Sequence, residues 1–94
     1  MRLTDALFNW LQIFIVAKER PHDQSAQKTV RFFADILRED HQVEQLEAEK
    51  DGNQYRVTFK QEGVAKEHAF LAEVAEKLYR EIQSDVRYQQ SFED

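Results

Sequence analysis

The first stretch of the chain is apolar around most of its circumference when it is read with the period of a helix. Between positions 3 and 17, Asp5, Asn9 and Gln12, with Thr4 beside them, form one narrow polar stripe, and almost all remaining positions are apolar. A helix with so little polar surface needs cover on most of its sides. The pattern therefore predicts a helix that the rest of the chain or a partner subunit must cover.

A short buried strand is the alternative for the second half of this segment. Residues 12–17 are rich in β-branched and aromatic side chains, and periodicity alone does not distinguish such a run from a helix. A continuous helix is favoured because Lys18, Glu19 and Arg20 extend the segment without a turn residue. Pro21 predicts the end of the helix near Arg20, since the residue before a proline disfavours helical geometry.

A second helix is predicted from Asp23 or Ser25 to about Glu39. The side chain of either Asp23 or Ser25 can accept hydrogen bonds from the free N–H groups of a first helical turn. Apolar side chains recur on one face at the spacing of an amphipathic helix, at Ala26, Val30, Phe33 and Leu37. We expect this face to contact the core.

From Val43 the pattern changes to a period of two, which predicts strands. Asp51-Gly52 suits a type I′ hairpin turn, whose two central residues both need positive φ. A two-residue loop at that pair sets the register of the hairpin. The predicted facing pairs are Lys50 with Asn53, Ala48 with Tyr55, Leu46 with Val57, Glu47 with Arg56, and Gln45 with Thr58. In this register the apolar residues gather on one face of the sheet.

A third strand is predicted from about Val64 to Ala69, after a turn at residues 61–63. Two registers are possible for it. A two-residue loop places His68 on the same face as Tyr55, together with Val64, Lys66 and Phe70. A three-residue loop with Gly63 in the left-handed conformation instead places Ala65, Glu67 and Ala69 there.

The last helix is predicted from Leu71 to about Asp85, and residues 87–94 are predicted to fray. Its buried stripe is predicted to comprise Leu71, Val74, Ala75, Leu78, Ile82 and Val86. The predicted fold class is therefore α+β in the order α-α-β-β-β-α, with a three-stranded antiparallel meander packed on one face by helices. With 94 residues the chain is expected to form a single domain, residues 1–94.

Composition narrows the range of partners. The chain has no cysteine and a formal net charge of −5. Without cysteine there are no disulfides and no thiolate chemistry, and the chain suits a reducing cytoplasm. Net acidity argues against nucleic-acid binding, which depends on neutralising phosphates. The best basic surface, at Lys18, Arg20, Gln24, Lys28 and Arg31, is what an ordinary solvated helix face also provides.

The apolar segment at residues 3–17 fits neither a signal peptide nor a membrane span. Lys18, Glu19, Arg20 and Pro21 follow it without a small-residue cleavage site. The segment is also shorter than the roughly 20 residues that a spanning helix needs. A membrane partner is therefore not expected.

No motif in the chain predicts catalysis or a cofactor. The two glycines, Gly52 and Gly63, fall in predicted hairpin turns, so a phosphate-binding loop has no residues to use. His22 and His41 lie at helix ends, where capping and the helix dipole account for them. No histidine pair has the spacing of a metal site, and we expect neither a metal nor another cofactor.

His68 and Tyr55 are the weak candidates for a polar site, because one register places them on the same face. A partly exposed position on an edge strand also accounts for His68. Glu47 and Glu49 share a face of their strand, as paired catalytic carboxylates do, but Arg56 on that face favours a wetted, charged surface.

The sequence has an apolar helix that could form an interface and no cluster of polar residues suited to catalysis. It therefore predicts a small non-enzymatic interaction or regulatory protein. A three-stranded sheet accommodates about two helices on one face, and the second and last helices have the single apolar stripe that suits those places. A homodimer would then cover the first helix. The predicted interface consists of Phe8, Trp10, Leu11, Phe14 and Ile15.

The expected partners are thus a second copy of the chain and an unknown protein. Two alternatives stay open. One is a membrane-peripheral protein that uses the same helix at a lipid surface. The other is a small-ligand-binding or enzymatic domain, whose pocket a sequence does not reveal.

Overall fold

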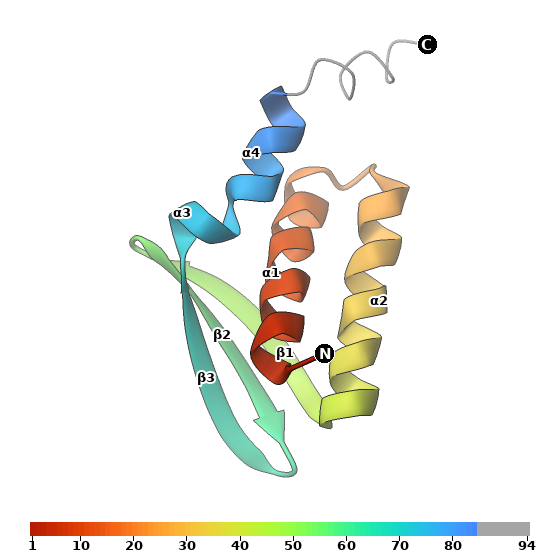
Figure 1. Ribbon diagram of the computed structural model, residues 1–94, viewed down its shortest axis with the longest axis vertical. Helices are drawn as coiled ribbons and strands as arrows, with labels where there is room; N and C mark the ends of the chain where they lie inside the picture. The colour runs from red at the N-terminus through yellow and green to blue at the C-terminus, as the bar shows by residue number, and fades with distance from the viewer. Residues whose placement is uncertain (85–94) are drawn as a thin grey trace.

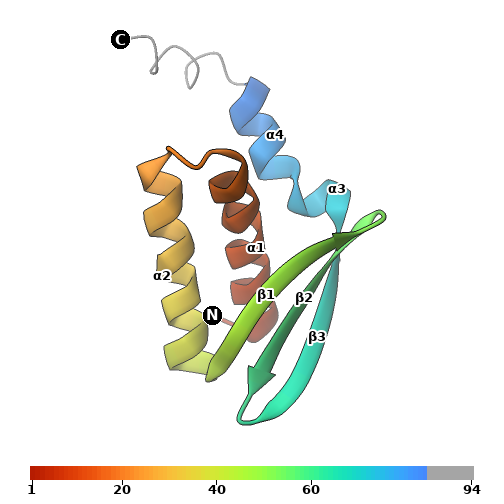
Figure 2. The same cartoon turned by 180° about the vertical axis from the view of Figure 1, so that it is seen from behind.

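The computed structural model describes residues 1–84, and they form the α+β arrangement that the pattern predicts. In chain order, the elements are α1 (Leu3–Glu19), α2 (Gln24–His41), β1 (Val43–Asp51), β2 (Gln54–Gln61), β3 (Val64–Leu71), α3 (Ala72–Ala75) and α4 (Lys77–Ser84). The strands form one antiparallel sheet in the order β1-β2-β3. Figures 1 and 2 show α1 between α2 and the sheet, with α4 beside the C-terminal end of α1.

Helix α1 is continuous, which confirms the helical prediction for residues 12–17 over the strand alternative. It ends at Glu19, where the backbone N–H of Arg20 donates to the carbonyl of Val16 at 2.8 Å. The chain then turns at Pro21, as expected from the restriction that a proline places on the residue before it.

Helix α2 begins after Asp23, the first of the two predicted caps. The Asp23 carboxylate accepts a hydrogen bond from the N–H of Ala26 at 3.0 Å, and Arg20 lies 3.2 Å from the same carboxylate. At the other end, Gln42 adopts the left-handed conformation with φ of 54° and directs the chain into β1.

The hairpin between β1 and β2 is present, but its turn was predicted wrongly. Asp51 faces Gln54, so the two-residue loop is Gly52-Asn53 and not Asp51-Gly52. Gly52 has φ of 64° and Asn53 does not have positive φ, which is the pattern of a type II′ turn. Because glycine suits the first place of a II′ turn as well as the second place of a I′ turn, the sequence pair alone does not decide between them.

The predicted register is wrong by two residues, but the face of the sheet predicted for each side chain is unchanged. In place of the predicted pairs, the structure pairs Lys50 with Tyr55, Glu49 with Arg56, Ala48 with Val57, and Glu47 with Thr58. Side chains alternate with a period of two, so a shift by two residues leaves each one on its original face. The alternation that supported the predicted register supports the observed one equally.

A β-bulge interrupts the ladder between Glu44 and Glu47, so Gln45 and Leu46 do not form their predicted pairs. Gln45 has φ of 53°. The extra residue reverses the alternation, and Val43 consequently turns inward, where it is 4% exposed. Burial of Val43 offsets the strain of a left-handed glutamine.

The second turn confirms the two-residue alternative. Gln61 faces Val64, and the loop residues Glu62 and Gly63 have φ of 52° and 81°, the positive pair that a type I′ turn requires. Tyr55 and His68 are therefore on the same face of the sheet, the face that the helices cover.

The buried side of the last helical region differs from the predicted stripe. Leu71 and Val74 were predicted to be buried and are 60% and 48% exposed. Leu71 is still the last residue of β3, so the helix begins one residue later and turns Ala72 inward. Ala75 is 0% exposed, which confirms its predicted burial.

A break at Glu76 then separates α3 from α4, and Tyr79 contacts the core beyond it. Leu78 and Ile82 are half-buried on the same helix. Val86 and the fraying predicted for residues 87–94 lie outside the described residues.

Two groups of apolar side chains surround α1. The larger joins α1 to α2, the sheet and α3, and its buried members are Ala6, Leu7, Trp10, Leu11, Ile15, Leu37, Val43, Val57, Phe59 and Ala75. The smaller joins the end of α1 to the start of α2 and to α4, with Val16, Ala17 and Ala26 buried. Within residues 1–84, no helix has the length and apolar character needed to cross a membrane.

Candidate functional site

Most of the five side chains predicted as a dimer interface lie inside the chain. Trp10, Leu11 and Ile15 are 5%, 0% and 5% exposed. Phe8 and Phe14 are half-buried: Phe8 lies against Phe70 with ring centroids 5.4 Å apart, and Phe14 stacks on Trp10 at 4.8 Å. The reason is that α1 itself occupies the sheet face that had been assigned to α2 and the last helix.

His68 and Tyr55, the two candidates for a polar site, share a face of the sheet without converging. Tyr55 faces Phe70 and His68 faces Val57 across the β2–β3 ladder. The His68 ring packs on Phe70, with centroids 4.7 Å apart, whereas the Tyr55 hydroxyl donates a hydrogen bond to Glu76 at 2.7 Å. The two side chains therefore take part in separate contacts.

Glu76, at the break between α3 and α4, is the polar side chain with the most partners on this face. One of its carboxylate oxygens accepts hydrogen bonds from the Tyr55 hydroxyl at 2.7 Å and the Lys50 ammonium at 2.9 Å. Arg80 lies 3.5 Å from the other oxygen. Residues of the β1–β2 hairpin thereby hold the helical region that follows the sheet.

The pKa values of Glu76 and Tyr55 are shifted in opposite directions. The hydrogen bond from Tyr55, followed by the one from Lys50, lowers the pKa of the Glu76 carboxyl. Burial, together with the hydrogen bond to Glu76, raises the pKa of the Tyr55 hydroxyl. Near neutral pH the carboxyl is ionised and the phenol is protonated. The pair is therefore suited to holding the helical region against the hairpin and poorly suited to proton transfer.

The other two histidines lie at helix ends. His22 is exposed in the turn between α1 and α2, and His41 Nε2 lies 3.0 Å from the carbonyl oxygen of Met1. Glu47 and Glu49 are on the outer face of the sheet. Among residues 1–84, no three or more His, Asp or Glu side chains are placed so that they could hold a metal ion.

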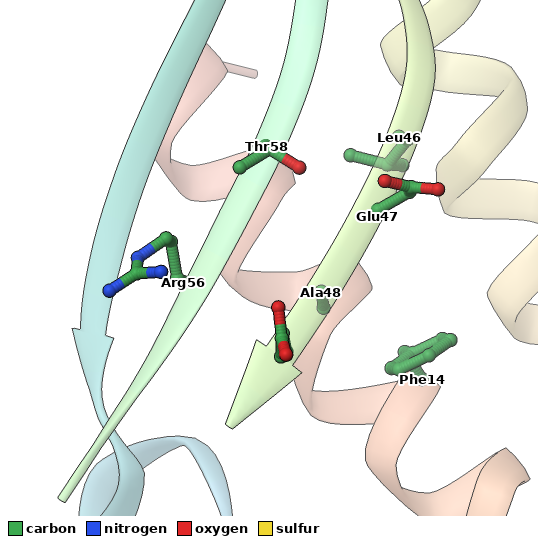
Figure 3. Close-up of a pocket in the computed structure, with 7 residues that line it drawn as sticks. Phe14, Leu46, Glu47, Ala48, Arg56 and Thr58 are labelled. Atoms are coloured by element: carbon green, nitrogen blue, oxygen red, sulfur yellow. The ribbon is translucent and has the colours of Figure 1, made fainter. Parts of the chain in front are cut away.

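A surface hollow of about 400 Å³ lies beside β1, next to a larger one of about 540 Å³, and Leu46, Glu47 and Thr58 line both. Phe14, Leu46 and Ala48 form its apolar lining, and the remaining lining residues are Glu47, Glu49, Arg56 and Thr58. Figure 3 shows Phe14 beyond the free edge of β1, next to Ala48, while Arg56 and Thr58 come from β2. The hollow thus joins a helix residue to the edge of the sheet.

In the described part of the chain no strand lies beside the backbone at this edge of β1, because β1 pairs with β2 alone. Asp51 and Gln54 flank a two-residue turn and form a hydrogen-bonded pair, so by alternation Ala48 and Lys50 belong to non-hydrogen-bonded pairs. Their N–H and C=O groups point away from β2. Within residues 1–84, no backbone hydrogen bond outside the regular elements uses these groups.

The outer side of the edge is acidic. Glu47 and Glu49 form no ion pair or side-chain hydrogen bond with any other residue in the described part of the chain. The nearby Arg56 is held by Asp51 and by Glu67, the latter at 3.3 Å. Lys50 is held by Glu76. Arg56 and Lys50 are therefore already paired, whereas the two glutamates are not.

The residues at this edge could not have been assembled from spacing alone. Phe14 is far from Leu46 and Ala48 in the sequence. The apolar pattern placed Phe14 in a predicted dimer interface and the other two only on the inner face of the hairpin. The available signal was the length of β1 and its run of carboxylates, which suit an edge strand. No protein family model, curated protein or solved structure matches the chain at a significant level.

Proposed function

We propose that this chain is a small non-enzymatic interaction protein that binds another polypeptide along the free edge of β1. The observation that carries the proposal is the combination of outward-pointing backbone groups at Ala48 and Lys50 with the adjoining hollow, part of which is apolar. Proteins commonly bind extended segments by adding a strand to such an edge, where the backbone supplies affinity and neighbouring pockets supply specificity.

A binding role has better support than catalysis. The side chains with shifted pKa values, Tyr55 and Glu76, are bonded to each other and sit away from the hollow. The hollow itself combines apolar side chains with backbone groups, which are the elements of peptide recognition. A cytoplasmic location is part of the proposal, and the lack of cysteine is compatible with it.

Self-association through α1 stays a prediction, and the fold reduces the surface available for it. Of the five side chains, Phe8 and Phe14 alone are not buried. The membrane-peripheral alternative needs the same apolar side chains of α1 and has no observation in its favour.

Proline substitution at Ala48 tests the proposed function. Proline lacks an N–H, and because the N–H of Ala48 points away from β2, Ala48→Pro removes an outward donor while the β1–β2 ladder keeps its bonds. The matched control is Ala69→Pro on β3, the opposite edge of the sheet. By the same alternation, the N–H of Ala69 also points outward.

Each variant is first checked by circular dichroism and then used to capture polypeptides from the cells that make the protein. We expect the wild type and Ala69→Pro to retain the same polypeptide and Ala48→Pro to lose it. Hydrogen exchange at the amide of Ala48 should slow when the purified polypeptide is added. Equal capture by folded Ala48→Pro, or no specific capture by any of the three, would contradict the proposal.

A further inference from the structure

We infer that the polypeptide bound at the edge of β1 is an extended segment in which basic and apolar residues alternate. This inference rests on the proposed function and adds the chemistry of the partner. It follows from the two different faces that an added strand would meet beside β1.

The outer face calls for positive charge. An added strand places its outward side chains beside Glu47 and Glu49, the carboxylates that have no cation partner within residues 1–84. Opposite charges on neighbouring strands stabilise pairing, and like charges destabilise it. Lysine or arginine at the outward positions would complete both pairs.

The inner face calls for apolar side chains. Leu46 and Ala48 point to the helix side of the sheet, and Phe14 extends past the edge of β1 on that side. Side chains on the inward positions of an added strand would lie against Phe14, Leu46 and Ala48, the apolar part of the lining of the hollow. Since successive residues of a strand point to opposite faces, the two requirements together predict alternation.

The same charges argue against a second copy of this chain as the occupant. An antiparallel pairing of two β1 strands about a twofold axis, with matching faces, can be centred on Glu47, Ala48 or Glu49. Each of these registers places a glutamate directly opposite a glutamate of the other copy. A basic segment avoids this repulsion.

The probe for the experiment is a synthetic peptide as long as β1, with alternating valine and lysine and with blocked ends. The controls are a peptide with alternating valine and glutamate, and a peptide with the composition of the probe in which the lysines are grouped together. Binding to the full chain is measured by isothermal titration calorimetry, and its location by amide hydrogen exchange. We expect the alternating basic peptide to bind and to slow exchange at Ala48 and Lys50, and neither control to do so.

Two double variants test the charge requirement. Glu47→Gln with Glu49→Gln should weaken binding of the basic peptide by about fivefold, as expected for the loss of two exposed ion pairs, and should reduce its salt dependence. Glu73→Gln with Glu81→Gln changes the net charge equally and also removes two carboxylates that form no ion pair in residues 1–84. This control should leave the affinity unchanged.

Several results would overturn the inference. These are equal binding of the acidic and basic peptides, protection of β3 amides in place of Ala48 and Lys50, and equal effects of the two double variants. If no basic peptide binds but a cellular polypeptide is still lost specifically in Ala48→Pro, the partner chemistry is wrong and the proposed function stands. If the cellular polypeptide is also retained by Ala48→Pro, both fail.

Discussion

At the scale of single residues, Glu76 connects the sheet to the helical region that follows it. Its carboxylate is 22% exposed and accepts hydrogen bonds from Tyr55 and Lys50. We expect Glu76→Gln to lower the free energy of unfolding by about 1 kcal/mol near neutral pH, because hydrogen bonds to a partly buried charged group are lost or weakened. Urea denaturation measures the change. Glu73→Gln, whose carboxylate forms no bond in the described chain, is the control and should be neutral.

The pH dependence of this contribution has a definite sign. The pKa of Glu76 is lowered from its ordinary value of 4.5, so its contribution is fully present above that pH and is lost as pH falls through the folded-state pKa. The difference in unfolding free energy between wild type and Glu76→Gln should therefore shrink as pH is lowered from 7 to well below 4.5. A difference that stays constant over this interval would mean that Glu76 is not held ionised by Tyr55 and Lys50.

The alkaline side should show the opposite dependence through Tyr55. Its pKa is raised from 10.0, so its protonated hydroxyl contributes stability below that pH, and the contribution is lost as pH rises above it. Tyr55→Phe removes the titrating group and should flatten the loss of stability above that pH. Parallel unfolding curves for the wild type and Tyr55→Phe across this range would show that Tyr55 is not the group responsible.

The role of a residue could be predicted from the sequence where its contacts are with near neighbours in the chain. Asp23 caps α2 with a bond to Ala26, three positions along the chain, and that spacing is visible in the sequence. Glu76 was not found, because its partners Tyr55 and Lys50 come from a hairpin that is remote in sequence. No local pattern distinguishes Glu76 from its exposed neighbours.

At the scale of elements, the turn between β1 and β2 depends on Gly52. Its φ of 64° is unfavourable for residues with a Cβ, and most of all for β-branched ones. Gly52→Val should therefore cost more than about 1 kcal/mol in unfolding free energy, measured by thermal and urea melts. Asn53→Ala is the control: Asn53 has no positive φ, and its carbonyl, which accepts a hydrogen bond from Ala72, is retained. Equal losses for the two variants would place the strain elsewhere.

The elements were largely predictable because periodicity identifies helices and strands without reference to contacts. Register was not, since a displacement by two residues preserves the faces and leaves Ala48 inward whether it pairs with Tyr55 or with Val57. The bulge at Gln45 was missed for a different reason. Its positive φ is tolerated because Val43 becomes buried, and that gain exists only in the assembled fold.

At the scale of the whole molecule, substitutions on α1 distinguish a position in the core from a position in a dimer interface. Leu11 is 0% exposed in the single chain. A charge there has no partner and costs several kcal/mol, comparable with the whole stability of a small domain. We expect Leu11→Asp to abolish cooperative folding, as measured by circular dichroism and thermal melting.

A folded Leu11→Asp chain would contradict the core position of α1. Sedimentation equilibrium would then show whether the substitution had released a monomer from a dimer of about twice the 11.2 kDa chain mass. Phe8→Asp is the comparison, because Phe8 is half-buried and is one of the predicted interface residues that reach the surface. It should change the mass without abolishing the fold if the dimer forms through α1.

The predicted need for cover around α1 was correct, while its source was not predictable. Periodicity reports how many faces of a helix are apolar, but not which layer the helix occupies. Two arrangements satisfy the same apolar pattern. In the observed one, α1 lies on the sheet and α2 lies against α1; in the predicted one, a second copy of the chain covers α1. The hollow at β1 depends on this choice, because Phe14 reaches the edge of the sheet only from the position that α1 occupies.

The carboxylates of β1 also bear on solubility. A nine-residue strand with an open edge is a template on which identical chains can stack into fibrils. Glu47 and Glu49 discourage such stacking, because two edges that meet bring like charges together. A chain in which neutral side chains replaced both carboxylates would keep the open edge without this protection, and its aggregation would begin there.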